Sequence, residues 1–183
     1  MSEHYSIAMN SYARAGLYRV RPCSGRPIRM RSNGRVESRS RLEAAVASML
    51  FVNLPVADVA RSRRFFGALG FRFDEMFCDQ ATVCMTINDA AMVILMQHRR
   101  FEGFAAGSIA DPTRGREALV SFSADSREHA DQLAGAALAA GGAPLRDPED
   151  FGFMYCCSFC DPDGHAWEVV WMDPSQLPQN PDG

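Results

Sequence analysis

Apolar and polar residues alternate in several short segments of the chain, and this alternation predicts strands. In residues 52–56 every second residue is Val or Leu, which places these side chains on one face of a strand. Asp58 follows as the N-cap of a helix over 59–69, and Gly70 ends that helix. Three further strands are predicted over 71–76, 81–88 and 91–97.

The same order of elements is predicted a second time. Residues 120–124 alternate as a strand, and Asp125 or Ser126 then caps a helix, with Glu128 placed for a capping box. This helix ends at Gly141. Three strands over 144–146, 153–160 and 165–172 complete the second copy, and a loop over 99–117 joins the two copies. The order βαβββ is therefore expected twice.

The last two predicted strands are joined by the sequence Asp-Pro-Asp-Gly over residues 161–164. Pro162 fixes φ at the second turn position and Gly164 can adopt a positive φ, so the segment predicts a β-hairpin. Glu168 is then an acid in the middle of an otherwise apolar strand. If residue 158 pairs with residue 168, Cys156, Ser158 and Cys160 share one face with Glu168.

The composition is that of a globular protein. Of the 183 residues 47% are apolar and 22% are charged, and no apolar run approaches the roughly 20 residues of a membrane span. The six cysteines form no pair of CxxC motifs, and nothing upstream has the pattern of a signal peptide. We therefore expect a cytoplasmic protein with free thiols and no membrane partner.

Residues 1–48 are predicted to be a disordered, arginine-rich arm. Residues 1–46 hold nine Arg and three Glu, a local charge of +6, and they show no apolar periodicity. Three interpretations are open: a translation start upstream of the real one at Met49, a targeting peptide, or a nucleic-acid-binding arm. Aromatic residues for base stacking are scarce, so we expect no nucleic-acid partner. Residues 175–183 are expected to form a flexible tail.

The repeated βαβββ unit, the segment LPVADVARSRRFFGALGF over 54–71 and the segment DPDGHAWE over 161–168 together resemble the vicinal oxygen chelate superfamily. That superfamily includes glyoxalase I, bleomycin-resistance proteins and extradiol dioxygenases. The resemblance implies an α+β fold in which two tandem modules form a cup-shaped mixed sheet with helices outside, and it implies a homodimer. It covers residues 49–174, with modules over 49–98 and 118–174 and a linker over 99–117.

Metal-dependent members of the superfamily hold a divalent ion with His, Glu or Gln side chains from up to four strands. The resemblance places these positions at Phe51, at Leu119 or Ala118, at Val93 or Ile94, and at Glu168. Glu168 alone has a side chain that can bind a metal ion. Because a zinc-type ion needs about three protein ligands, we expect no metal and no other cofactor.

The resemblance and the strand alternation also give a set of residues expected to line the cup. The ligand-binding candidates are Phe51, Asn53, Leu119, Ser121, Cys156, Ser158 and Glu168, with Ser123, Val170 and Met172 on the same wall. A mostly apolar wall with a few polar groups is typical of small-molecule pockets. Asn53 needs a partner from either a neighbouring strand or a ligand. His98 is a further candidate at the mouth of the cup, and the thiols are expected to pack as small apolar groups.

The sequence leaves several functions open. The first is a metal-free protein that binds a small hydrophobic or aromatic molecule in its cup. The alternative is a metal-independent lyase or isomerase in which Glu168 is the general acid or base, its pKa raised by desolvation if no cation is near. A third is a partner-binding protein that has lost its small-molecule site.

Overall fold

The structure is a computed structural model that describes residues 49–112, 114–116 and 118–176. The predicted arm over 1–48 and most of the predicted tail lie outside these residues. No helix among them is long and apolar enough to cross a membrane. The elements are β1 (Leu50–Val56), α2 (Val59–Ala68), β2 (Arg72–Phe73), η1 (Glu75–Phe77), β3 (Thr82–Asn88), β4 (Ala91–Gln97), α3 (His98–Ala105), β5 (Leu119–Ser123), α4 (Arg127–Ala139), β6 (Ala143–Asp150), β7 (Met154–Cys160) and β8 (Ala166–Met172).

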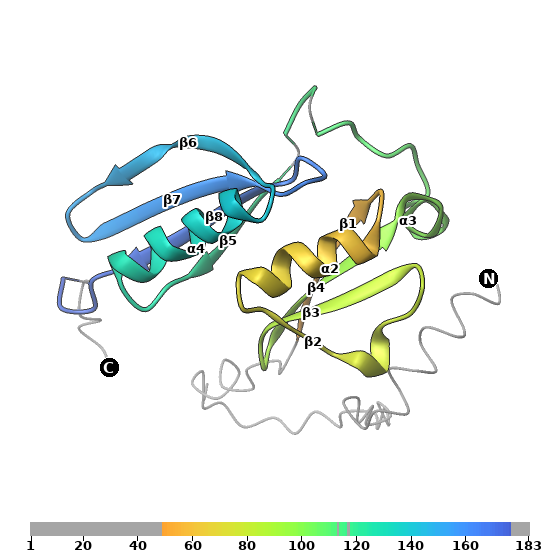
Figure 1. Cartoon of the computed structure of the whole chain (residues 1–183), viewed down its shortest axis with the longest axis horizontal. Helices are drawn as coiled ribbons and strands as arrows, with labels where there is room; N and C mark the ends of the chain where they lie inside the picture. The colour runs from red at the N-terminus through yellow and green to blue at the C-terminus, as the bar shows by residue number, and fades with distance from the viewer. Residues whose placement is uncertain (1–48, 113, 117, 177–183) are drawn as a thin grey trace, which may run out of the picture. The chain divides into compact units, whose positions relative to one another are not determined.

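The described strands form two four-stranded mixed sheets (Figure 1). The first sheet has the order β1-β4-β3-β2 and the second the order β5-β8-β7-β6. In each sheet the first pair of strands is parallel and the other pairs are antiparallel. Helix α2 packs on the first sheet and α4 on the second. The predicted α+β fold with two tandem βαβββ modules is confirmed.

Both module helices begin at a side-chain cap. The Asp58 carboxylate accepts a hydrogen bond from the Ala60 backbone N–H at 2.8 Å. In the second module the cap is Ser126, whose hydroxyl accepts from the His129 N–H at 3.0 Å, so the choice between residues 125 and 126 is decided. These caps satisfy N–H groups that the helix itself leaves without partners.

Three segments differ from the predicted elements: β6 (Ala143–Asp150) is longer than the strand expected over 144–146, and two further segments change type. The strand expected over 71–76 is only Arg72–Phe73, because Asp74 caps the N–H of Met76 at 3.1 Å and starts the 3₁₀ helix η1. The expected loop over 99–117 contains α3, whose Phe101 packs on an apolar cluster of the first sheet. The alternation of apolar and polar residues indicates neither the capping bond of Asp74 nor the packing of Phe101.

The main core lies between the sheets and helices α2 and α4. It contains residues of both modules: Phe66 of α2 contacts Trp167 of β8 edge to face, with ring centroids 4.9 Å apart. Trp167, Phe66 and Phe159 are among the largest fully buried side chains. The opposite face of each sheet, turned away from these helices, is called the inner face below.

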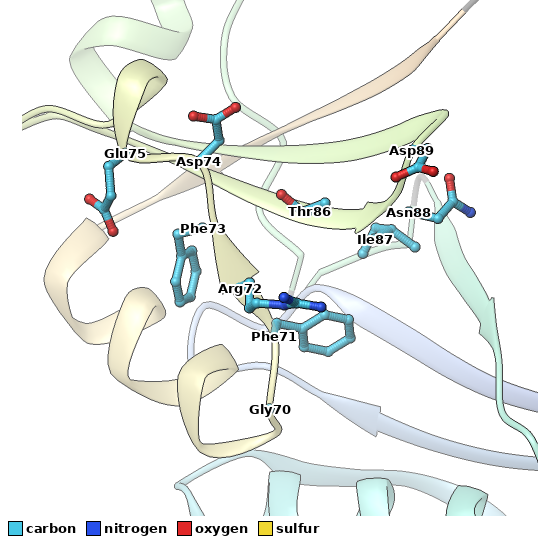
Figure 2. Close-up of a pocket in the computed structure, with 10 residues that line it drawn as sticks. All are labelled: Gly70, Phe71, Arg72, Phe73, Asp74, Glu75, Thr86, Ile87, Asn88 and Asp89. Carbon is cyan, nitrogen blue, oxygen red and sulfur yellow. The ribbon is translucent and has the colours of Figure 1, made fainter.

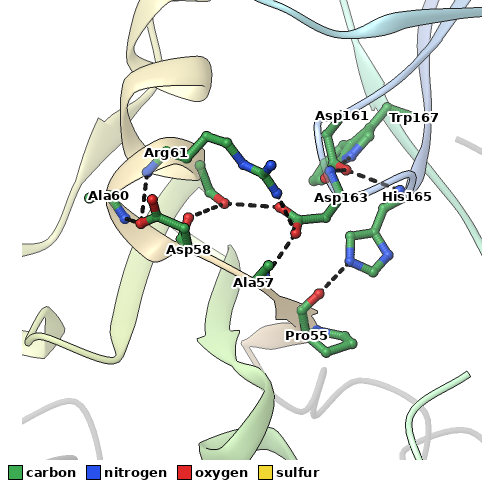
Figure 3. Close-up of polar contacts among 10 residues, drawn as sticks. Pro55, Ala57, Asp58, Ala60, Arg61, Asp161, Asp163, His165 and Trp167 are labelled. Carbon is green, nitrogen blue, oxygen red and sulfur yellow. Dashed lines mark hydrogen bonds and ion pairs between the residues drawn. The ribbon is translucent and has the colours of Figure 1, made fainter. Parts of the chain in front are cut away.

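The β7–β8 turn connects the second module to the start of α2 (Figure 3). The Asp163 carboxylate accepts from the Ala57 N–H at 2.8 Å and from Arg61 at 2.7 Å. His165 Nε2 donates to the Pro55 carbonyl at 2.6 Å. Asp161 is buried and accepts from Trp167 Nε1 and from the His165 N–H, both at 3.0 Å. We call this set of contacts the turn clasp.

We expect Asp163→Ala to lower the free energy of unfolding by about 2 kcal/mol, because it removes two charge-assisted hydrogen bonds and leaves Arg61 without its anion. Urea denaturation followed by circular dichroism measures the change. Asp147→Ala, at an exposed position of β6, is the matched control and should change stability little. Equal effects of the two substitutions would contradict the clasp.

Two glycines give a second test of the packing. A Cβ at Gly142 would lie 2.6 Å from the Cys160 carbonyl oxygen, whereas a Cβ at Gly135 in α4 would meet nothing within 4 Å. Gly142→Ala should therefore lower the melting temperature, at a cost of about 1–3 kcal/mol for overpacking. Gly135→Ala should raise it, by up to about 1 kcal/mol of helix propensity. A stabilising Gly142→Ala would show that this contact is wrong.

Candidate functional site

Four polar residues form a row across the inner face of the second sheet. Ser121 on β5 is the cross-strand partner of Glu168 on β8, Glu168 pairs with Ser158 on β7, and Ser158 pairs with Arg146 on β6. The expected pairing of residues 158 and 168 is therefore confirmed. We call Ser121, Glu168, Ser158 and Arg146 the polar row. Their neighbours along β7 and β8 pack into the main core, so the row lies on the inner face.

The Glu168 carboxylate is bonded on both sides. Arg146 Nη2 donates to its Oε1 and forms an ion pair, and the Ser121 hydroxyl donates to its Oε2 at 3.0 Å. Arg146 also binds Glu149 through Nε at 2.9 Å. The general acid or base role of Glu168 was predicted for a carboxylate with no cation near it. The structure instead places the guanidinium of Arg146 beside Glu168.

The ion pair between Arg146 and Glu168 passes over Ser158. Neighbouring strands lie about 4.8 Å apart, so β6 and β8, with β7 between them, are about 10 Å apart. Side chains that meet across this distance must extend over β7. Ser158 is accordingly only 8% exposed, and its hydroxyl has no hydrogen-bond partner within the described residues. Such a buried hydroxyl lacks the partner that buried polar groups usually have.

The rest of this inner face is apolar and partly open. Cys156 and Cys160 are buried on either side of Ser158, and burial, followed by the charge of Glu168, raises the pKa of the Cys156 thiol. Leu119 and Met172 are 44% and 46% exposed. A charged pair surrounded by accessible apolar groups can bind the polar and apolar parts of one small molecule.

The structure divides the predicted ligand-binding set between the two sheets. Ser121, Cys156, Ser158 and Glu168 lie together on the inner face of the second sheet, with Leu119 on the same strand as Ser121. Phe51 instead packs in an apolar cluster of the first sheet with Ile94 and with Phe101 of α3. Asn53 is exposed on β1, where water can solvate its amide. His98, expected at a cup mouth, begins α3.

Sequence reasoning missed Arg146 and Glu149. The strand that carries them was predicted only over residues 144–146, and in the structure it continues through Pro148 to Asp150. In the structure β6 is an edge strand with register shifts on both sides of Arg146, and these shifts bring Arg146 opposite Ser158. One signal was available in the sequence: the predicted strand over 144–146 ends in a charged residue, Arg146, and the next strand along the chain is rich in Cys and Ser.

Two cavities elsewhere contain no residue of the polar row. A groove of about 620 Å³ lies beside β2 and the end of β3 and includes Arg72, Asp74 and Asp89 (Figure 2). A second cavity, of about 450 Å³, is lined by His98, Glu102, His165 and part of the loop over 108–112. In this cavity His165 is bound to the Pro55 carbonyl as part of the turn clasp.

Comparison with known proteins identifies the family. Residues 48–88 match the family described as bleomycin resistance protein-like N-terminal. A hypothetical protein from S. aureus is 31% identical, with a TM-score of 0.59 over 68% of this chain and 92% of that chain. A glyoxalase/bleomycin resistance protein/dioxygenase family enzyme from Burkholderia phytofirmans is 20% identical, with a TM-score of 0.60 over 68% and 98% of the two chains. The chain belongs to the vicinal oxygen chelate superfamily.

A further solved structure agrees with this fold. A glyoxalase-related enzyme from Fulvimarina pelagi is 20% identical, with a TM-score of 0.58 over 74% of this chain and 94% of that chain. No protein of curated function matches the sequence. The vicinal oxygen chelate fold is therefore established for this chain, whereas its ligand has to be inferred from its own residues.

The metal-ligand positions of the vicinal oxygen chelate superfamily do not fit a metal ion in this chain. Val93 lies in the main core and Ile94 on the inner face, so the third position is Ile94. The cap at Ser126 selects Leu119 for the second module. Phe51, Ile94 and Leu119 have no lone pairs to donate. No group of three His, Cys, Asp or Glu side chains within the described ranges could hold a metal ion.

The reactivity of the cysteine thiols tests how deeply each of them is buried. Burial raises the pKa of Cys84 and of Cys157 to about 11 and also raises that of Cys156, whereas Cys78 is half-buried. Among the cysteines of the described residues, iodoacetamide at pH 8 should therefore modify Cys78 first, with Cys156 at least 10-fold slower than in the urea-unfolded chain, because thiolate and access are both needed. Peptide mapping by mass spectrometry measures the order. Cys156 reacting as fast as Cys78 would contradict the burial.

Proposed function

We propose that this vicinal oxygen chelate protein binds a small, largely apolar organic molecule on the inner face of the second sheet, without a metal ion. The observation that supports this proposal is the ion pair of Arg146 and Glu168 within a partly open apolar face. Such a combination can orient a ligand by its polar group while apolar side chains bind its body. Glu168 is then a ligand-orienting residue.

The contacts of Glu168 favour binding over catalysis. A general base must reach a substrate proton within about 3 Å, yet both carboxylate oxygens are already engaged by Arg146 and Ser121. A substrate proton would therefore have to share the Glu168 oxygens with these two contacts. The metal-independent lyase or isomerase is therefore the second candidate, and loss of a measured turnover in Glu168→Gln would favour it.

We also propose that the protein is a cytoplasmic homodimer. The cysteines of the described residues are free, which agrees with a reducing compartment. Strands β1 and β5 are at the edges of their sheets, and Leu50 on β1 is largely exposed. Unpaired strand edges with apolar side chains favour association with another chain. Light scattering of the purified protein tests this assembly.

A neutral aromatic probe tests the location of binding. We expect 2-naphthol to bind, and Met172→Ser to weaken its affinity about fivefold, because part of a methionine side chain contributes about 1 kcal/mol of apolar contact. Met76→Ser, at a methionine of η1 that is 73% exposed, is the matched control and should leave the affinity unchanged. Isothermal titration calorimetry measures both. Equal affinities of wild type and Met172→Ser would place the ligand elsewhere.

A further inference from the structure

Arg146, the cation of the polar row, is shared by two carboxylates: Glu168 of the row and Glu149, which lies outside it. Arg146 is bound to both Glu168 and Glu149, so this group of three side chains has a net charge of −1. The Glu168 side chain is only 13% exposed, which reduces the ability of water to screen its charge. An anionic ligand would add to the negative charge, whereas a cationic ligand would neutralise it.

Arg146 can release Glu168 and remain paired. Its Nε is already bound to Glu149, three residues further along β6, at 2.9 Å. The Arg146 side chain is partly exposed and its guanidinium stays charged in proteins. Moving its Nη2 away from Glu168 therefore keeps one ion pair, provided that a ligand cation compensates Glu168.

Removal of the guanidinium from Glu168 would uncover a set of three hydrogen-bond acceptors. Glu168 lies between Ser121 and Ser158 in the register of the sheet. The Ser158 hydroxyl, buried below the ion pair, has no partner within the described residues and can accept a hydrogen bond. Two hydroxyls and one carboxylate match the three N–H donors of a primary ammonium group.

Resting on the proposed binding function, we infer that the ligand carries a primary ammonium group, which replaces Arg146 on Glu168 while Arg146 stays with Glu149. The ammonium donates to the Glu168 carboxylate and to the hydroxyls of Ser121 and Ser158. The apolar body of the ligand lies toward Met172. Arg146 and the ammonium group of the ligand thus compete for the Glu168 carboxylate.

Three probes with the same aromatic body separate the contributions of charge and hydrogen bonding. They are 2-phenylethylamine, 2-phenylethanol and trimethyl(2-phenylethyl)ammonium, titrated at pH 7 by isothermal calorimetry. We expect the amine to bind at least 10-fold more tightly than the alcohol, because the alcohol has no charge. The trimethyl compound should bind at least fivefold more weakly than the amine, because it has no N–H donor.

Substitutions of Glu168, Arg146 and Glu149 should change amine binding in different directions. Glu168→Gln should remove the preference for the amine. Arg146→Met should tighten amine binding at least fivefold, because the competitor is gone. Glu149→Gln should weaken amine binding, because Arg146 then has Glu168 as its remaining carboxylate partner among these three side chains. Asp147→Asn, exposed on the same strand as Glu149, is the matched control and should leave amine binding unchanged.

The outcomes distinguish this inference from the proposed function. Equal binding of amine and alcohol would overturn the ammonium site and keep the apolar binding face. An amine preference that persists in Glu168→Gln would overturn the assignment of the cation to Glu168. If Arg146→Met does not fold, Glu149→Gln and Ser158→Ala, each expected to weaken the amine alone, decide the question. No binding by any probe would overturn both proposals.

Discussion

The turn clasp holds the β7–β8 hairpin and the start of α2 through the carboxylates of Asp161 and Asp163. Asp161 fixes the start of β8 through Trp167 and the His165 backbone, and Asp163 fixes the start of α2 through Ala57. One four-residue turn therefore sets the hairpin register and also links the two modules. That register places Glu168 between Ser121 and Ser158. The register shifts of β6 then bring Arg146 opposite Ser158 and complete the polar row.

The two modules share one topology but have different inner faces. In the first module Phe51, Met92 and Ile94 form an apolar cluster with Phe101 of α3. In the second module the corresponding face has the polar row, and its edge is partly exposed. Within the described residues a repeated fold thus has the polar row in one copy and an apolar cluster in the other, because the side chains and not the strand order determine the chemistry. The ion pair of Arg146 with Glu168 uses a carboxylate at a position where metal-dependent relatives bind an ion.

Local sequence signals were sufficient for most of the fold. The N-cap at Asp58, the turn over 161–164 and the strand alternation are properties of neighbouring residues, and the structure confirms them. The position of Glu168 on its strand could be predicted for the same reason. Arg146 could not, because its pairing with Ser158 depends on bulges in β6. Helix α3 could not, because its Phe101 packs on a cluster that includes Phe51 and Cys84, which are far from it in the sequence.

The most direct measurement is a crystal structure of the protein with 2-phenylethylamine bound. We predict that the ammonium group contacts Glu168, that the aromatic ring lies near Met172, and that Arg146 is paired with Glu149 only. The contrary result is a ligand in the groove beside β2, or in the cavity beside His98, with the ion pair of Arg146 and Glu168 unchanged. That result would remove the inner face of the second sheet as the binding site.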